Sequence, residues 1–290
     1  MSILCLIANP ADSELSPALA TAIARETGGR LNWLAHSIAC EIIAPKSTDA
    51  LAIAKDLAGG VALDCAEISS KNRRKMLLIA DMDSTMINEE CIDELADALG
   101  IKPQVADITA RAMNGELDFS QALETRVALL KGLEHSVIEK VRRERITLAP
   151  GGRALVKTMR EHGAYTSLVS GGFTFFADFI AKRIGFDEAL ANELECDGEA
   201  LAGTIAKPVV DKDTKLSRLN ALLDEKGIDR AASIAVGDGA NDLPMLQGAG
   251  LGVALHAKPA VADQAHVRID HGDLTALLYL QGYTEDEIVR

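Results

Sequence analysis

Short apolar runs alternate with stretches of helical spacing along the chain after residue 75. Four of these runs, each followed at once by small or polar residues, predict strands at residues 76–80, 164–169, 232–236 and 251–255. Helical spacing predicts helices at residues 153–162, 173–184, 214–226 and 241–248. This alternation favours an α/β fold, a Rossmann-like, doubly wound parallel sheet covered on both faces. Ligands bind such sheets beyond the carboxyl ends of the strands, where the polar residues fall here.

Two insertions interrupt this pattern. Residues 89–145 contain several stretches of helical spacing, and a segment of this length is too long for a simple connecting loop. We therefore expect a helical cap over the strand ends. Residues 192–210 carry Asp197-Gly198 between alternating residues, which predicts a small β-hairpin flap.

The first 70 residues have a pattern of their own. They indicate a strand, a helix, two strands, a helix and a last strand, at residues 2–8, 15–27, 30–35, 38–44, 47–57 and 60–68. This order is typical of a ferredoxin-like α+β domain. The basic cluster at residues 71–75 could be a nuclear address or an anion patch, but it is most typical of a solvated linker ahead of a buried strand. We therefore expect one domain at 1–70 and a second at 71–290, with its cap at about 89–145.

The composition is that of a globular protein. Of 290 residues, 48% are hydrophobic and 25% are charged, which excludes a disordered chain. The net charge of −13 gives no general attraction to nucleic acid or to anionic lipid, so we expect neither as a partner. An anionic substrate would need a metal ion, a Lys or Arg, or backbone N–H groups to hold it.

The cysteines and the N-terminus indicate the compartment. The five cysteines are scattered, odd in number and without a CxxC pair, which argues against a disulfide framework or a zinc site. The N-terminus lacks the basic region of a signal peptide, and no apolar stretch reaches the ~18 residues of a membrane helix. We expect a cytoplasmic protein.

The strongest chemical signal is the pair Asp81 and Asp83 directly after the first predicted strand, followed by Ser84-Thr85. Residues two apart leave an extended strand on the same side, where two carboxylates raise each other's pKa. A divalent cation relieves this repulsion, and Mg²⁺ prefers a few carboxylates together with water and phosphate. A carboxylate can also act as a nucleophile and form an aspartyl-phosphate.

Three weaker signals lie further along the chain. Asp238 lies between glycines after the third strand and can supply another oxygen to a metal, although a turn that caps a helix explains it equally well. Ser170-Gly171-Gly172 can hold phosphate oxygens at a helix start, or form a plain glycine-rich turn. Lys215, near the start of a helix, either meets an anion or is simply exposed.

At these residues the chain resembles the haloacid dehalogenase-type (HAD-like) phosphatases, whose motifs are DxD[ST]T, a Ser or Thr after the second strand, a Lys, and GDxxND. All four occur here in that order. The resemblance narrows to the phosphoserine phosphatases at four stretches, residues 81–90, 113–119, 126–130 and 237–242, and covers about residues 72–285. Residues 1–70 are similar to the ACT-like extension of some members.

The resemblance implies an enzyme that hydrolyses O-phospho-L-serine to L-serine and phosphate, the last step of serine biosynthesis. It implies Asp81 as the nucleophile and Asp83 as the general acid and base. Mg²⁺ would be held by Asp81, the backbone carbonyl of Asp83, and Asp238. The resemblance also implies that the phosphate is held by Ser170, Gly171 and Lys215. Asn241 would contact either the substrate or its phosphate.

In the cap, the resemblance implies that Glu90 meets the substrate ammonium and that Arg126 meets its carboxylate, while Met113 and Phe119 wall the pocket. From the residues alone, the two charged side chains fit a solvated helix face and the two apolar ones fit cap core. The alternatives are a related phosphatase or phosphotransferase acting on another small phosphomonoester, and an amino-acid-sensing protein without activity. Assembly into a homodimer is also left open.

Overall fold

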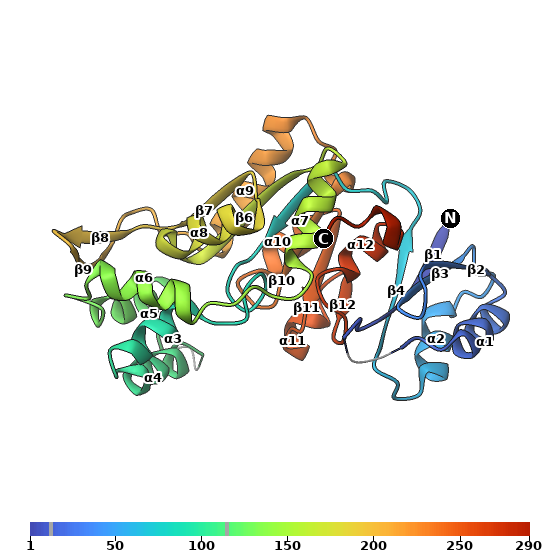
Figure 1. Ribbon diagram of the computed structural model, residues 1–290, viewed down its shortest axis with the longest axis horizontal. Helices are drawn as coiled ribbons and strands as arrows, with labels where there is room; N and C mark the ends of the chain where they lie inside the picture. The colour runs from blue at the N-terminus through green and yellow to red at the C-terminus, as the bar shows by residue number, and fades with distance from the viewer. Residues whose placement is uncertain (12–13, 114–115) are drawn as a thin grey trace.

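The computed structural model describes residues 1–11, 14–113 and 116–290, with only the backbone of Met113. The described chain forms three parts in a row (Figure 1). A small α+β unit at the N-terminus packs against one side of the central sheet. The cap helices and a two-stranded hairpin lie on the other side of that sheet.

The central sheet is parallel throughout, as the sequence predicts. Within the described residues it has six strands in the order β12-β11-β10-β5-β6-β7. Their bounds are Leu77–Ala80 (β5), Tyr165–Phe173 (β6), Glu188–Asn192 (β7), Ser233–Gly237 (β10), Leu251–Leu255 (β11) and Val267–Ile269 (β12). The sequence pattern missed the two edge strands, β7 and β12. Both are short and include charged or amide side chains, so neither forms a continuous apolar run.

Helices cover both faces of this sheet. They are α7 (Gly152–Glu161), α8 (Thr174–Ile184), α9 (Lys212–Lys226), α10 (Leu243–Gly248), α11 (Pro259–Ala262) and α12 (Ala276–Leu280), with short 3-10 turns at Arg230–Ala232 and Glu285–Glu287. Alternate residues of β5 point to opposite faces: Leu77 and Ile79 pack with α9, whereas Leu78 and Ala80 join the larger apolar cluster on the other face. The doubly wound fold class is confirmed.

The cap is also confirmed. Its helices are α3 (Cys91–Ala98), α4 (Lys102–Met113), α5 (Phe119–Ala128) and α6 (His135–Glu144). The hairpin of β8 (Leu194–Asp197) and β9 (Ala200–Ile205) extends the cap, because Leu201 exchanges backbone hydrogen bonds with Gly132 and Leu133, at 2.8 and 2.9 Å. A capping box fixes the start of α5: Asp118 Oδ1 accepts from Gln121 N at 2.8 Å, and Gln121 Oε1 accepts from Asp118 N at 3.1 Å.

The N-terminal unit has the predicted element order. It contains β1 (Ser2–Ala8), α1 (Pro17–Thr27), β2 (Arg30–Ala35), β3 (Ala39–Ile43), α2 (Ala50–Ala58) and β4 (Leu63–Ser69), and its antiparallel sheet has the order β2-β3-β1-β4. The last strand begins later than residue 60. Gly59 and Gly60 both have positive φ, 53° and 91°, and end α2 with a left-handed turn that no strand can include.

The interpretation of the basic cluster as a solvated linker holds for Lys71, Asn72 and Arg74, which are exposed, but was wrong for Arg73 and Lys75. Arg73 forms a largely buried ion pair with Glu41 of β3 at 2.5 Å and donates from Nε to the Leu280 carbonyl at 2.8 Å. Lys75 is buried as well, 7% exposed. Asp64 of β4 adds a further link, because its carboxylate accepts the backbone N–H groups of residues 270–272 at 2.7–3.2 Å.

Two further features bear on the expectations from composition. All five cysteines are free thiols, and Cys5, Cys40 and Cys91 are buried. Among the described residues, no helix has both the length and the apolar character needed to cross a membrane.

Candidate active site

The candidate catalytic residues gather at the carboxyl edge of the central sheet. Asp81 directly follows β5, and Asp238 directly follows the neighbouring β10. Ser170 lies on β6, which pairs with β5 on its other side. Parallel strands place these residues on one edge of the sheet although they are far apart in sequence.

Lys215, in the first turn of α9, is buried beneath this edge between two carboxylates. Its Nζ lies 2.6 Å from Asp81 Oδ1 and 2.7 Å from Asp242 Oδ1, and the lysine side chain is 1% exposed. Although burial opposes the charge, Asp81 and Asp242 raise the pKa of Lys215 above its usual value. Burial, then the charge of Asp242, raises the pKa of Asp81 against the opposing effect of Lys215.

Asp81, Asp238 and Asp242 form an acidic cluster with carboxylate oxygens within 4.8 Å of one another. Thr85 donates to Asp238 Oδ1 at 3.1 Å and orients it. Burial, then the charge of Asp242, raises the pKa of Asp238 to about 6. Three carboxylates beside one ammonium leave excess negative charge, and their oxygen atoms are ligands that Mg²⁺ prefers. The residues therefore fit a divalent cation.

Asp83 lies beside this cluster with different partners. Its Oδ1 accepts from the backbone N–H of Cys91 at 3.0 Å, at the start of the first cap helix. Burial raises the pKa of Asp83. A Cβ atom on Gly172 would lie 2.7 Å from Asp83 Oδ2, so glycine is needed there to admit the carboxylate.

The Ser170-Gly171-Gly172 segment differs from its prediction. These residues belong to β6, at an irregular stretch of its pairing with β7, and α8 begins only at Thr174. The expected junction of a strand end with a helix start is therefore present, but the residues do not form a separate glycine-rich turn. Ser170 is fully buried, and its Oγ accepts from Gly172 N at 2.8 Å. Asn192 donates to the Gly171 carbonyl at 2.8 Å and fixes this part of the strand.

A cavity of about 510 Å³ lies above these strand ends, a volume within the range of small-molecule sites. Its walls bring together most of the residues singled out from the sequence: Asp81, Asp83, Glu90, Phe119, Arg126, Ser170, Gly171, Asp238 and Asn241. Lys215 reaches the site from below through Asp81. The side chain of Met113 lies outside the described residues, so its proposed place in the wall stays a prediction.

Two cap residues of opposite charge, Glu90 and Arg126, line this cavity. Glu90 Oε1 accepts from Ser84 Oγ at 2.7 Å, and Ser84 has a φ of 53°, a strained left-handed conformation in the turn after Asp83. Burial, then the charge of Asp83, raises the pKa of Glu90 to about 7. Arg126 donates from Nε to the Ala122 carbonyl at 3.3 Å, and burial lowers its pKa.

Some residues of the site were missed by the sequence analysis. Asp242 fell at the start of the helix predicted at residues 241–248 and received no other role, although it belongs to the same GDxxND motif as Asp238. Its own fully buried carboxylate instead holds Lys215 and accepts from Gly239 N at 3.0 Å. Thr85 was part of the DxDST signal but received no role. Asp93, Thr109 and Lys258 also line the cavity, and no local pattern distinguishes them from exposed helix or loop residues.

Comparisons with known proteins agree with this geometry. The family model for haloacid dehalogenase-like hydrolases matches residues 78–247. A phosphoserine phosphatase of Haemophilus influenzae is 46% identical over 222 residues, which cover 76% of this chain and 70% of that protein.

Two solved structures share the fold. A HAD family hydrolase of Salmonella enterica serovar Typhi has a TM-score of 0.84 at 29% identity, covering 99% of this chain and 100% of that one. A phospho-aspartyl intermediate analogue of phosphoserine phosphatase has a TM-score of 0.66 at 37% identity, covering 71% and 98% of the two chains. The family match spans more than half of the 290 residues, and it includes both acidic strand ends. The chain belongs to the haloacid dehalogenase-like hydrolases.

Proposed function

We propose that the protein is a Mg²⁺-dependent phosphoserine phosphatase that hydrolyses O-phospho-L-serine to L-serine and phosphate. The observation that carries the proposal is the lining of one cavity. It contains a carboxylate that can act as the nucleophile, and also an acidic and a basic side chain that can bind the ammonium and the carboxylate of an amino acid. Asp81 lies at its floor, and Glu90 and Arg126 lie in its cap wall. The relative from Haemophilus influenzae carries the same activity in its name.

In the first step, Asp81 attacks the phosphorus atom and the bond to the serine oxygen breaks. Met82 N and Lys215 Nζ both contact Oδ1 of Asp81, at 2.8 and 2.6 Å, which leaves Oδ2 as the attacking oxygen. Asp83, whose pKa is raised by burial, gives its proton to the leaving serine oxygen. The products of this step are serine and an aspartyl-phosphate on Asp81.

In the second step, water hydrolyses the aspartyl-phosphate. Asp83 is now ionised and takes a proton from the attacking water. The oxygen of that water forms a bond to phosphorus while the bond to Asp81 breaks. Phosphate leaves, Asp81 returns as a carboxylate, and Asp83 is again protonated, so that protons balance over the cycle.

The metal ligands we propose are Asp81, the Asp83 backbone carbonyl and Asp238. Asp242 is a poorer candidate, because Lys215 and Gly239 N already contact its two oxygens. When bound, Mg²⁺ supplies positive charge that offsets the charge of the phosphoryl group during transfer. Ser170, Gly171 and Asn241 line the cavity around Asp81 and hold the phosphate oxygens in this proposal.

We propose that the cap selects the amino acid. The planar guanidinium of Arg126 suits the substrate carboxylate, and the carboxylate of Glu90 suits its ammonium. Phe119 lies over the phosphate end, since a Cβ on Gly171 would lie 3.3 Å from its ring. Closing of the cap would exclude water from the first step.

We also propose a division of the chain near residue 70, with a first unit at 1–70. Its antiparallel sheet pairs within itself and shares no strand with the central sheet. Leu4 and Leu6 of β1 belong to an apolar cluster confined to this unit. Ile3, Cys5 and Ile7 of the same strand nevertheless pack into the cluster of the core, so we expect the two units to stay docked.

The activity is tested by phosphate release from O-phosphoserine, O-phosphoethanolamine and 3-phosphoglycerate, each with and without Mg²⁺. Rapid release from O-phosphoserine only, and only with Mg²⁺, is the expected result. Equal release from all three would favour the alternative, a phosphatase for other small phosphomonoesters. No release from any of them would favour an inactive sensor.

A further inference from the structure

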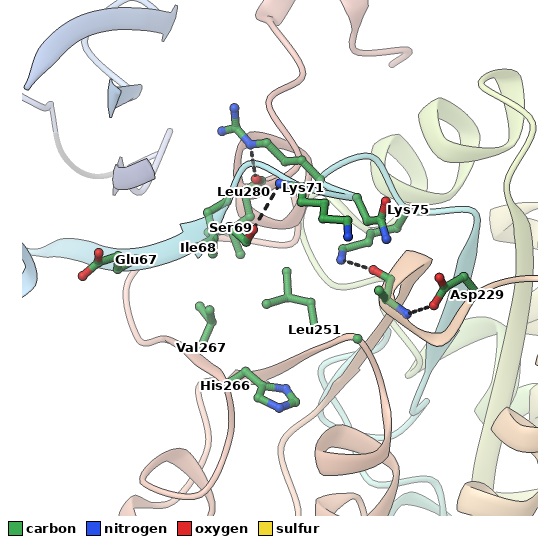
Figure 2. A pocket seen from close by; sticks show the side chains of 14 residues that line it. Glu67, Ile68, Ser69, Lys71, Lys75, Asp229, Leu251, His266, Val267 and Leu280 are labelled. Atoms are coloured by element: carbon green, nitrogen blue, oxygen red, sulfur yellow. Dashed lines mark hydrogen bonds between the residues drawn. The ribbon is translucent and has the colours of Figure 1, made fainter. Parts of the chain in front are cut away.

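A second cavity, of about 410 Å³, lies where the N-terminal unit meets the core (Figure 2). It is lined by the end of β4, by the segment at residues 71–75, and by residues just before β10 and at the starts of β11 and β12. These are the amino ends of the central strands. The cavity therefore lies at the opposite edge of the sheet from Asp81, and nothing in the proposed reaction uses it.

The ammonium of Lys75, which lines this cavity, is buried, and no carboxylate in the described part of the chain lies beside it. Its side chain donates to the Ala231 carbonyl at 2.7 Å, as Figure 2 shows, which accounts for one of the three N–H groups of an ammonium. Among the described residues, no carboxylate lies within ion-pair distance of Lys75, although the residue is only 7% exposed. Burial lowers its pKa, as expected for a cation without a counter-ion.

Other donors also line the cavity. Lys71 is exposed at its rim. Nδ1 of His266 accepts from Gly252 N at 2.8 Å, so the neutral ring carries its proton on Nε2, where it can donate. The guanidinium of Arg73 has few N–H groups left for a ligand, because Glu41 and backbone carbonyls already accept from it.

The carboxylates of the cavity have partners of their own. Glu67 accepts from Ser2 Oγ, and Asp229 accepts from Ala231 N at 2.9 Å. Their charges would repel a dianion more strongly than a monoanion. The rest of the wall is apolar, formed by Ile68, Leu251, Val267 and Leu280. This combination suits a ligand with one negative charge and a short hydrocarbon part.

We propose that this cavity binds a small monocarboxylic acid. The carboxylate accepts hydrogen bonds from Lys75 and Lys71, and its hydrocarbon chain lies against Leu251 and Val267, which Figure 2 places on the facing wall. The ligand supplies the counter-ion that Lys75 lacks. Because this site and the active site lie at opposite edges of the sheet, both can be occupied at once.

Butanoate is a suitable probe, with butanamide and butylammonium as neutral and cationic controls of the same size. Binding to the full-length protein is measured by saturation-transfer NMR and calorimetry. We expect saturable binding of butanoate and none of either control. Lys75→Met should weaken it by about tenfold or more, because a buried charge-assisted contact is lost.

Since Lys75 is buried, Lys71→Glu provides a variant at an exposed position that should fold normally. It places a negative charge at the rim and should also weaken butanoate binding, by about fivefold. Lys182→Glu makes the same change on the exposed face of α8 and should leave binding unchanged. Excess O-phosphoserine should not displace butanoate.

Three results would overturn the proposal. One is the absence of saturable butanoate binding. Another is equal binding of butanamide, because the cavity would then recognise only the hydrocarbon chain. The third is binding that survives Lys71→Glu but is lost in Arg126→Ala or displaced by O-phosphoserine, because the carboxylate would then occupy the active site.

Discussion

Oδ1 of Asp242 lies 2.7 Å from Nζ of Lys215, and both side chains are almost completely excluded from solvent. The backbone makes this contact possible: a Cβ atom on Gly237 would lie 2.5 Å from the carboxyl carbon of Asp242. Asp242 also accepts from Gly239 N, so its own position is fixed. In the proposed reaction it acts through Lys215, whose ammonium lies against Asp81, the proposed nucleophile.

We therefore expect Asp242→Asn to misplace Lys215 with little change in size. A displacement of about 1 Å near reacting groups can cost on the order of 100-fold in rate, so kcat for O-phosphoserine should fall by about that factor. Asp213→Asn is the matched control, since Asp213 is exposed in the first turn of the same helix. Full activity of Asp242→Asn, with a normal circular dichroism spectrum, would show that Lys215 needs no such support.

Thr85 should tune metal affinity, because its hydroxyl orients Asp238. Loss of a hydrogen bond that orients a metal ligand typically costs about 10–100-fold in affinity. Thr85→Val should raise the Mg²⁺ concentration for half-maximal activity within that range and weaken Mn²⁺ binding in calorimetry. Thr125→Val, on the exposed face of α5, should change neither. Activity of metal-stripped wild-type protein in excess EDTA would contradict the metal assignment as a whole.

Arg126 should contribute specificity rather than chemistry. A charge-assisted contact to the substrate carboxylate is worth roughly 1.5–3 kcal/mol, so Arg126→Ala should lower kcat/KM for O-phosphoserine by about 10–150-fold. The low activity on O-phosphoethanolamine, which lacks that carboxylate, should change little. Arg143→Ala provides an exposed cap arginine for comparison. Equal losses on both substrates would indicate a structural role for Arg126.

The pKa of Glu90, raised to about 7, gives the enzyme a specific pH dependence. Below that pH the carboxyl group is increasingly protonated and loses its attraction for the substrate ammonium. We expect kcat/KM for O-phosphoserine to fall as pH decreases through about 7, with a dependence on one proton. Titration of the substrate phosphate adds its own change near pH ~6. The Glu90→Gln variant separates the titration of Glu90 from that of the substrate phosphate. It should lower kcat/KM and abolish only the change near pH 7.

The sequence predicted those parts of the fold whose hydrophobic pattern is continuous. The strands containing Leu78 and Val236 are buried along their whole length, because helices cover both of their faces. The edge strand containing Glu188 has no such run, and its charge is balanced by Arg218, 2.6 Å away and 30 residues later. A contact of that kind has no local signature.

The candidate site was predictable to the extent that its residues directly follow strands. Asp81 and Asp238 are conspicuous because each ends an apolar run. Asp242 was not, since an Asp before a helix is also a common cap, and only the buried position of Lys215 distinguishes the two roles. The docking of the N-terminal unit was likewise hidden, because Arg73 looks like any linker cation until Glu41 is placed beside it.

The central claim is that Asp81 carries the phosphoryl group during turnover. It is tested most directly by reacting the protein with ³²P-labelled O-phosphoserine and Mg²⁺, quenching rapidly in acid, and locating the label by peptide mass spectrometry. The account predicts an acid-stable, alkali-labile acyl phosphate on Asp81 that appears within one turnover and is absent in Asp81→Asn. Label on Ser84 or Ser170, or turnover by Asp81→Asn at the wild-type rate, would contradict it.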